Sequence, residues 1–187
     1  MLWVTRARIH LDRVASPWLI ARFVDREAAF GFLGADEPVP AGAVPFALPG
    51  AELGPHDADG STFRKILDRF DVEAPELQAM ARCVEAGIAV ALGRPLPDGH
   101  SVIVAHGRAM ASFSEAMAAL YGADDHANLA ASMACYDALY ITLWTAFGDC
   151  PSLPGDVVAR IEAVRTARDW PALLPPWLPR SAGTLAS

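Results

Sequence analysis

The feature that most constrains the fold is a long apolar stripe near the carboxyl end of the chain. After Asp124, large apolar side chains recur at helical spacing as far as Phe147, a pattern typical of an amphipathic helix. Asp124 is a residue type that caps helix N-termini, so the helix is predicted to begin directly after it. Such a helix must bury its stripe against other elements. The stripe consists of Leu129, Met133, Tyr136, Tyr140, Leu143, Trp144 and Phe147.

The N-terminal third of the chain predicts a small sheet. Apolar runs at residues 2–5, 29–33 and 44–48 are typical of short strands, the last at a sheet edge because it contains Pro45. From residue 61 onward the pattern changes to helices. We therefore expect an α+β fold, in which an N-terminal sheet of about three strands packs on a mainly helical C-terminal half.

Local capping signals predict where the helices begin and end. The predicted helix starts are Ser16 with Pro17, Ser61 or Thr62, Ala74, residue 98 and Pro154, and the predicted ends of the last three are Gly87, residue 121 and Ala167. At 187 residues, the chain is long enough for one domain with a core. We predict a single domain over residues 1–170 and a Pro-rich tail over 171–187.

Composition narrows the class of protein. A net charge of −7 argues against a chain that binds nucleic acid by itself. No apolar run reaches the roughly eighteen residues that a membrane span needs, and charged residues interrupt any secretory signal near the N-terminus. The three cysteines are widely spaced, with no C-x-x-C pair, which fits a reducing compartment. We expect a cytoplasmic protein that does not bind membranes.

Arginines are concentrated at the start of the chain. Residues 1–26 hold five arginines against two acidic residues, whereas the remainder carries ten basic and twenty acidic residues. A basic segment on an acidic body is one way to build an anion site. The alternative is that these arginines form surface ion pairs.

A loop at residues 52–60 is a candidate metal site. Glu52 and His56 combine a carboxylate with an imidazole, ligands that suit a divalent metal such as zinc, manganese or iron. The start of the following helix could instead bind an oxyanion through free backbone N–H groups. In a third interpretation, Asp57, Asp59 and Gly60 only form a turn and cap that helix.

The long helix carries two further candidates. His126 lies in its first turn and is a tentative metal ligand, although Asp124 and Asp125 beside it are explained by the positive end of the helix dipole. Asp137 falls on the apolar stripe, where a carboxylate needs a partner. We predict a buried ion pair between Asp137 and an N-terminal arginine, Arg6 or Arg13.

Several segments resemble one known family. Residues 3–6 (WVTR) and 12–25 (DRVASPWLIARFVD) are similar to the start of the C-terminal domain of ChrB-type chromate-resistance proteins. The resemblance continues through residues 29–32, 44–46, 52–56, 61–63, 124–126 and 136–140. It implies a role in chromate resistance, as a sensor or accessory regulator of the chromate stress response in bacteria that also carry a chromate efflux pump.

The resemblance makes a small oxyanion such as chromate the expected ligand. Chromate is a tetrahedral dianion, and the forked guanidinium of arginine suits such ions. We expect Arg6, Arg13 and Arg22 to bind it, with Asp12 and Asp25 orienting them. The alternatives are a metal-dependent enzyme that uses Glu52 and His56, with His126 brought close by the fold, and a structural interaction module. No motif identifies a catalysed reaction, so the sequence leaves open whether the protein is an enzyme. It also leaves open whether the chain forms a homo-oligomer.

Overall fold

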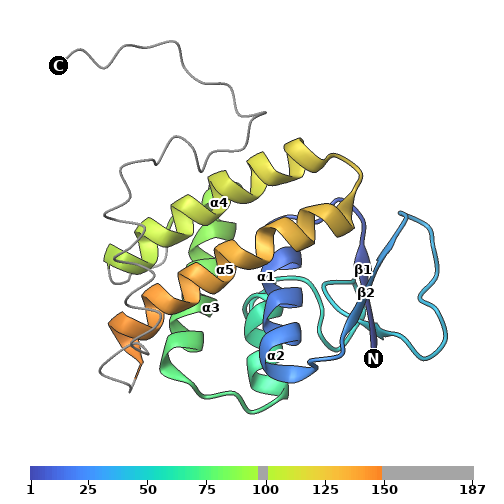
Figure 1. Ribbon diagram of the computed structural model, residues 1–187, viewed down its shortest axis with the longest axis horizontal. Coiled ribbons are helices and arrows are strands. Elements are labelled where there is room, and N and C mark those ends of the chain that lie inside the picture. Colours follow the sequence, from blue (N-terminus) through green and yellow to red (C-terminus); the bar gives the residue numbers. More distant parts are fainter. Residues whose placement is uncertain (97–100, 149–187) are drawn as a thin grey trace, which may run out of the picture. The chain divides into compact units, whose positions relative to one another are not determined.

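A three-stranded parallel sheet and five α-helices make up residues 1–96 and 101–148, the part of the chain that the computed structural model describes (Figure 1). These residues belong to a single unit that spans residues 1–151. The α+β fold predicted from the sequence is confirmed: the sheet lies in the N-terminal part, α1 and a π-helical turn connect its first two strands, and the other four α-helices follow the sheet.

The sheet has the order β2-β1-β3, so the first strand is central. Strand β1 (Leu2–Arg6) pairs in parallel with β2 (Ala29–Leu33) and with the short β3 (Val44–Pro45). As predicted, the strand that contains Pro45 lies at an edge, where a missing N–H costs no ladder hydrogen bond. The pairing continues for one residue beyond β3, since the Phe46 N–H donates to the Val4 carbonyl at 3.0 Å.

The two faces of the sheet have different neighbours. Successive side chains of a strand point to opposite faces. Trp3 is buried in the large core together with helical side chains such as Trp18 and Phe63. Val4 faces the other way, into a small cluster with Leu33 and Leu48. The helices therefore pack on one face of the sheet, and the loop after β3 covers the other.

The helices follow the predicted order. They are α1 (Asp12–Leu19), a π-helical turn η1 (Ile20–Val24), α2 (Thr62–Arg69), α3 (Pro75–Ala91), α4 (Ser101–Tyr121) and α5 (Asp125–Phe147). Ser61 caps α2 and Asp124 caps α5, as the sequence predicts. Helices α4 and α5 lie side by side and antiparallel (Figure 1), joined by a tight turn in which Gly122 has a φ of +60°.

Two helix boundaries were predicted wrongly. Helix α1 begins at Asp12 instead of after Ser16, and Pro17 lies inside it. Ser16 does not cap the helix; its hydroxyl donates to Asp12 Oδ1 at 3.2 Å. Helix α3 continues to Ala91 instead of ending near Gly87.

Three parts of the sequence prediction lie outside the described residues. These are the helix start expected at residue 98, the helix expected from Pro154 to Ala167 and the Pro-rich tail over 171–187. Among the described helices, none is both long enough and apolar enough to cross a bilayer.

Candidate functional site: a cleft at the carboxyl ends of two strands

A cleft of about 240 Å³ lies where the chain leaves β1 and β3. In open α/β sheets, ligands bind outside the carboxyl ends of the parallel strands. Here the segment after β1 and the loop after β3 meet the end of α3. The lining residues are His10, Leu11, Asp12, Arg13, Ala47, Pro55, His56, Thr62, Ile88, Ala91 and Leu92.

The backbone of the cleft is strained at two of its lining residues. Leu11 has a φ of 46° and Ala47 a φ of 50°, and Arg8, just before the cleft, has a φ of 60°. Residues other than glycine rarely adopt this left-handed conformation, which is costly and is found most often at functional sites. The strain indicates that the surrounding structure holds this backbone in place.

Arg13 supplies a partly buried positive charge to the cleft. Its Nη1 lies 3.5 Å from the carbonyl oxygens of Arg6 and Ala7, the limit of a hydrogen bond. Within the described residues, no carboxylate lies within 4.0 Å of its guanidinium. Burial lowers the pKa of Arg13, while the charges of Asp125 and Asp12 act in the opposite direction. A guanidinium in this setting stays charged and keeps donors for a ligand.

Two histidines line the same cleft from different segments. His10 Nδ1 lies 3.3 Å from the Arg8 carbonyl, so a proton on Nδ1 completes that bond and leaves Nε2 for a ligand. His56 Nε2 lies 3.2 Å from Arg94 Nη1. A guanidinium can only donate, so His56 Nε2 accepts and its Nδ1 carries the proton. Each imidazole therefore has its tautomer set by one neighbour.

Asp12 is directed at the start of α2. Its carboxylate accepts from the backbone N–H groups of Thr62 (2.8 Å) and Phe63 (3.1 Å), while Ser61 Oγ accepts from the Arg64 N–H at 3.1 Å. Burial raises the pKa of Asp12 even though these bonds favour its ionised form. The first N–H groups of α2 are thus already occupied, which argues against the alternative of an anion site at this helix start.

The structure does not bring Arg6, Arg13 and Arg22 into one cleft. Arg6 Nη1 donates to the carbonyls of Gly34 (2.5 Å) and Glu37 (2.8 Å), which holds the turn after β2. Arg22 forms a two-pronged ion pair with Asp137, with Nε–Oδ1 at 2.9 Å and Nη2–Oδ2 at 2.8 Å. Of the three arginines, Arg13 is the one that lines the cleft.

The predicted ion pair of Asp137 was wrong in its partner and in its burial. The partner is Arg22 instead of Arg6 or Arg13, and the pair is half-exposed, with 41% of the Asp137 side chain accessible. Trp18 Nε1 also donates to Asp137 Oδ1 at 2.8 Å. Asp25, predicted to orient an arginine, accepts instead from Trp3 Nε1 at 3.0 Å and from the amino group of Met1 at 2.7 Å.

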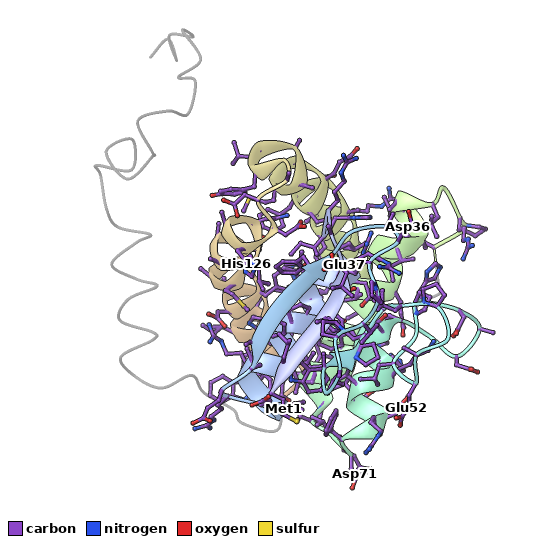
Figure 2. The ribbon with its side chains drawn as sticks, turned by 90° about the vertical axis from the view of Figure 1, so that its right-hand side faces the viewer. Met1, Asp36, Glu37, Glu52, Asp71 and His126 are labelled. Atoms are coloured by element: carbon purple, nitrogen blue, oxygen red, sulfur yellow. The ribbon has the colours of Figure 1, made fainter. Side chains whose placement is uncertain are left out.

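The three predicted metal ligands lie apart. Glu52 pairs with Arg69, with Nε–Oε1 at 2.7 Å, and His126 packs edge-on against Phe32 at 4.8 Å between ring centres. Figure 2 shows Glu52 and His126 on opposite sides of the sheet, and His56 lies in the cleft. In the described part of the chain, no group of three His, Cys, Asp or Glu side chains could hold a metal ion.

Sequence reasoning missed the contribution of α3 to the cleft. Ile88, Ala91 and Leu92 form one wall, and Arg94 just beyond them sets the tautomer of His56. A helix expected to end near Gly87 could not place these residues. The signal that could have found them is that no glycine, proline or polar turn residue follows Gly87 until Gly93.

Comparisons with known proteins identify one family. The family model described as "ChrB, C-terminal domain" matches residues 3–143. A curated relative, Protein ChrB of Cupriavidus metallidurans, is 39% identical over 71 residues, which cover 38% of this chain and 19% of that protein. The match thus spans about a fifth of the relative. No solved structure matches the chain.

Proposed function

The chain belongs to the family of ChrB C-terminal domains, and from this premise we propose that it serves chromate resistance as an oxyanion-responsive sensor or accessory regulator. Its ligand in this proposal is a tetrahedral dianion such as chromate, bound in the cleft that Arg13, His10 and His56 line. Family membership supports the general role in chromate resistance. The geometry of the cleft supports the choice of ligand.

The observation that carries the proposal is that three side chains that can donate hydrogen bonds, from two distant segments of the chain, line one cleft. Arg13 comes from α1, His10 from the segment before it and His56 from the loop after β3. Arginine presents several N–H donors in a fixed plane, which suits the oxygen atoms of a tetrahedral anion. The Nδ1–H of a neutral His56 would add a donor, whereas His10, whose Nδ1–H donates to the Arg8 carbonyl, would donate from Nε2 only as an imidazolium.

The other two candidate arginines, Arg6 and Arg22, already have hydrogen-bond partners, which favours Arg13 as the residue that binds the anion. The Arg6 side chain is committed to two backbone carbonyls, and Arg22 already pairs with a carboxylate. An anion would have to displace these partners, whereas at Arg13 it would replace two long contacts with carbonyl oxygens.

The test is binding of sulfate, a non-oxidising tetrahedral dianion, and of chromate. Each anion should raise the melting temperature, by an amount equivalent to about 2.7 kcal/mol at a hundredfold excess over the dissociation constant. In Arg13→Gln and His56→Gln the anion-dependent shift should disappear while the far-UV spectrum is kept. Isothermal titration calorimetry gives the dissociation constants directly.

The control is Arg26→Gln, which removes the same charge from an exposed position and should bind both anions as the natural chain does. If Arg13→Gln and Arg26→Gln lose affinity equally, the anion responds to net charge and the cleft is not its site. Elemental analysis of the purified protein tests the metal-dependent alternative. About one equivalent of zinc, manganese or iron, lost in His56→Ala, would favour that alternative over an anion sensor.

A further inference from the structure

One face of α5 carries four polar side chains that are buried. Asp125, Asn128, Ser132 and Tyr136 are spaced three or four residues apart and so form a single stripe along the helix. Their exposed fractions are 5%, 2%, 1% and 2%. We call these four residues the α5 clamp. Buried polar groups need partners, and each member of the clamp has one.

Asp125 holds two consecutive backbone N–H groups. Its Oδ2 accepts from the Arg8 N–H at 2.7 Å, and its Oδ1 accepts from the Ile9 N–H at 2.8 Å. Successive N–H groups point at one anion when a residue in the turn adopts a left-handed conformation, as Arg8 does with a φ of 60°. The carboxylate of Asp125 thus fills a small concavity of the backbone and stabilises its unusual geometry.

The other clamp residues extend this hold along the same segment. Asn128 Nδ2 donates to the Ile9 carbonyl at 3.0 Å, and Ser132 Oγ donates to Asn128 Oδ1 at 3.2 Å. The Tyr136 hydroxyl donates to the Leu11 carbonyl at 3.2 Å. Burial raises the pKa of Tyr136, so this hydroxyl keeps the proton that it donates.

The clamped segment is the one that carries His10 into the cleft and leads into Arg13. We propose that the α5 clamp is the positioning device of the anion site: it holds residues 8–11 in a strained conformation and thereby sets where His10 and Arg13 lie before a ligand arrives. This inference rests on the proposed function for its ligand. The clamp residues do not themselves line the cleft, so they act through the backbone that they bind.

The inference can be tested, because the loss of the Asp125 charge and the loss of its hydrogen bonds predict opposite changes in the affinity for the anion. Asp125 is a negative charge close enough to Arg13 to favour its charged form. Replacing Asp125 with Asn removes a repulsion on an incoming dianion, so charge alone predicts equal or tighter binding. Loss of the clamp predicts weaker binding, since only a fraction of molecules would then hold the site in its competent form.

The experiment is calorimetric titration of the full chain with sulfate at 25 °C. We expect Asp125→Asn to weaken sulfate binding about tenfold, the effect of losing one charge-assisted hydrogen bond. The matched control is Asp124→Asn, which changes the charge equally one residue away. Asp124 Oδ1 caps the Ala127 N–H, and Asn caps helices as well as Asp does, so this variant should bind sulfate at least as tightly as the natural chain. Natural affinity in a folded Asp125→Asn protein would overturn the proposal.

A second variant decides the matter if Asp125→Asn does not fold. Tyr136→Phe deletes one hydroxyl and one hydrogen bond and should weaken sulfate binding about threefold at full helicity; unchanged affinity would overturn the proposal. NMR of the anion-free protein separates the two hypotheses. The His10 imidazole and Arg13 Nε–H resonances should move in the clamp variants but not in Asp124→Asn. That result would support the clamp even if sulfate failed to bind the natural chain, a failure that counts against the proposed function alone.

Discussion

Asp137 of α5 forms a two-pronged ion pair with Arg22. Both side chains are nearly half-exposed, at 41% and 45%, and exposed pairs contribute only about 0–1 kcal/mol to stability. Trp18 is different, because its ring is buried and its Nε1 donates to the same carboxylate. The stabilising effect of Asp137 therefore depends on the tryptophan as much as on the arginine.

The first stability prediction follows from these two partners. Asp137→Ala should lower the free energy of unfolding by about 1–2 kcal/mol, because it removes the ion pair with Arg22 and also leaves the Trp18 N–H without its acceptor. Asp137→Asn keeps an acceptor and should cost about half as much. Urea titrations measure both. Asp68→Ala, at an exposed position of α2, should stay within about 0.5 kcal/mol; equal losses in Asp137→Ala and Asp68→Ala would contradict the role of Trp18.

The same residue predicts a pH dependence. The hydrogen bonds from Arg22 lower the pKa of Asp137 below its ordinary value of 3.8; burial acts in the opposite direction, and the hydrogen bond from Trp18 adds a smaller lowering effect. A lowered carboxyl pKa stabilises the fold above the ordinary value, and this stabilisation is lost as the pH falls through the lower, folded value. The stability difference between the natural chain and Asp137→Asn should therefore be constant above about pH 5 and shrink below about pH 4.

At the scale of elements, the N-terminus of α2 is capped both by its own N-cap residue and by a side chain of α1. Ser61 caps it locally, and Asp12 reaches over from α1 to bind its first two N–H groups. Ser61→Ala should cost about 1 kcal/mol. Asp12→Ala should cost about 2–3 kcal/mol, because it leaves two N–H groups without an acceptor at a buried helix start.

Denaturant unfolding of both α2 cap variants checks this prediction, with Ser112→Ala on the exposed face of α4 as the control. The control should change the free energy of unfolding by less than about 0.5 kcal/mol. A smaller loss of unfolding free energy in Asp12→Ala than in Ser61→Ala would show that water replaces Asp12 as the acceptor for the first N–H groups of α2. The contact between α1 and α2 at this point would then contribute little to stability.

The elements that were predicted correctly are those whose position is determined by residues within or directly beside the element. Strand β2 and the starts of α2 and α5 have caps or apolar runs within their own few residues. The start of α1 was missed because Ser16 followed by Pro17 is a strong local signal, whereas the actual start at Asp12 depends on contacts with α2. The end of α3 was missed because Gly87 is typical of a helix end, although its role here is to allow close packing.

At the scale of the whole molecule, α3 and α4 cross at a pair of glycines. A Cβ atom on Gly107 would lie 2.5 Å from the Ala86 Cβ and 3.0 Å from the Gly87 backbone nitrogen. Gly87 in turn lies against Leu11, since a Cβ on it would be 3.1 Å from that side chain. The crossing therefore fixes the distance between α3 and α4 and supports one wall of the cleft.

Gly107→Ala should accordingly destabilise the fold by about 1–3 kcal/mol, because the two helices must separate to admit the methyl group. Gly34→Ala is the matched control: its new Cβ would meet its nearest neighbour, Glu37 Oε2, at 3.7 Å, so stability should change by less than about 0.5 kcal/mol. Thermal unfolding measures the loss of stability in each variant. Similar losses in Gly107→Ala and Gly34→Ala would show that α3 and α4 can move apart without a loss of stability.

The candidate site could be predicted only in part. Asp12, Arg13 and His56 were all predicted as site residues, because imidazole, carboxylate and guanidinium groups are recognisable in any sequence. Their grouping was not predicted, since it depends on the carboxyl ends of two strands meeting the end of α3. Arg6 and Arg22 were given the same role as Arg13 because all three lie in one basic segment, and only the folded chain distinguishes their partners.

The clamp on residues 8–11 also has a consequence for the order of synthesis. A ribosome makes a chain from its N-terminus, so the segment that carries His10 emerges before α5. The carboxylate that holds this segment follows 117 residues after Arg8, and the hydroxyl that holds Leu11 follows 125 residues after it. Contacts over such separations form late because the loop between them must close first. A nascent chain that has not reached Tyr136 therefore already carries the residues of the cleft but has no complete clamp to hold them.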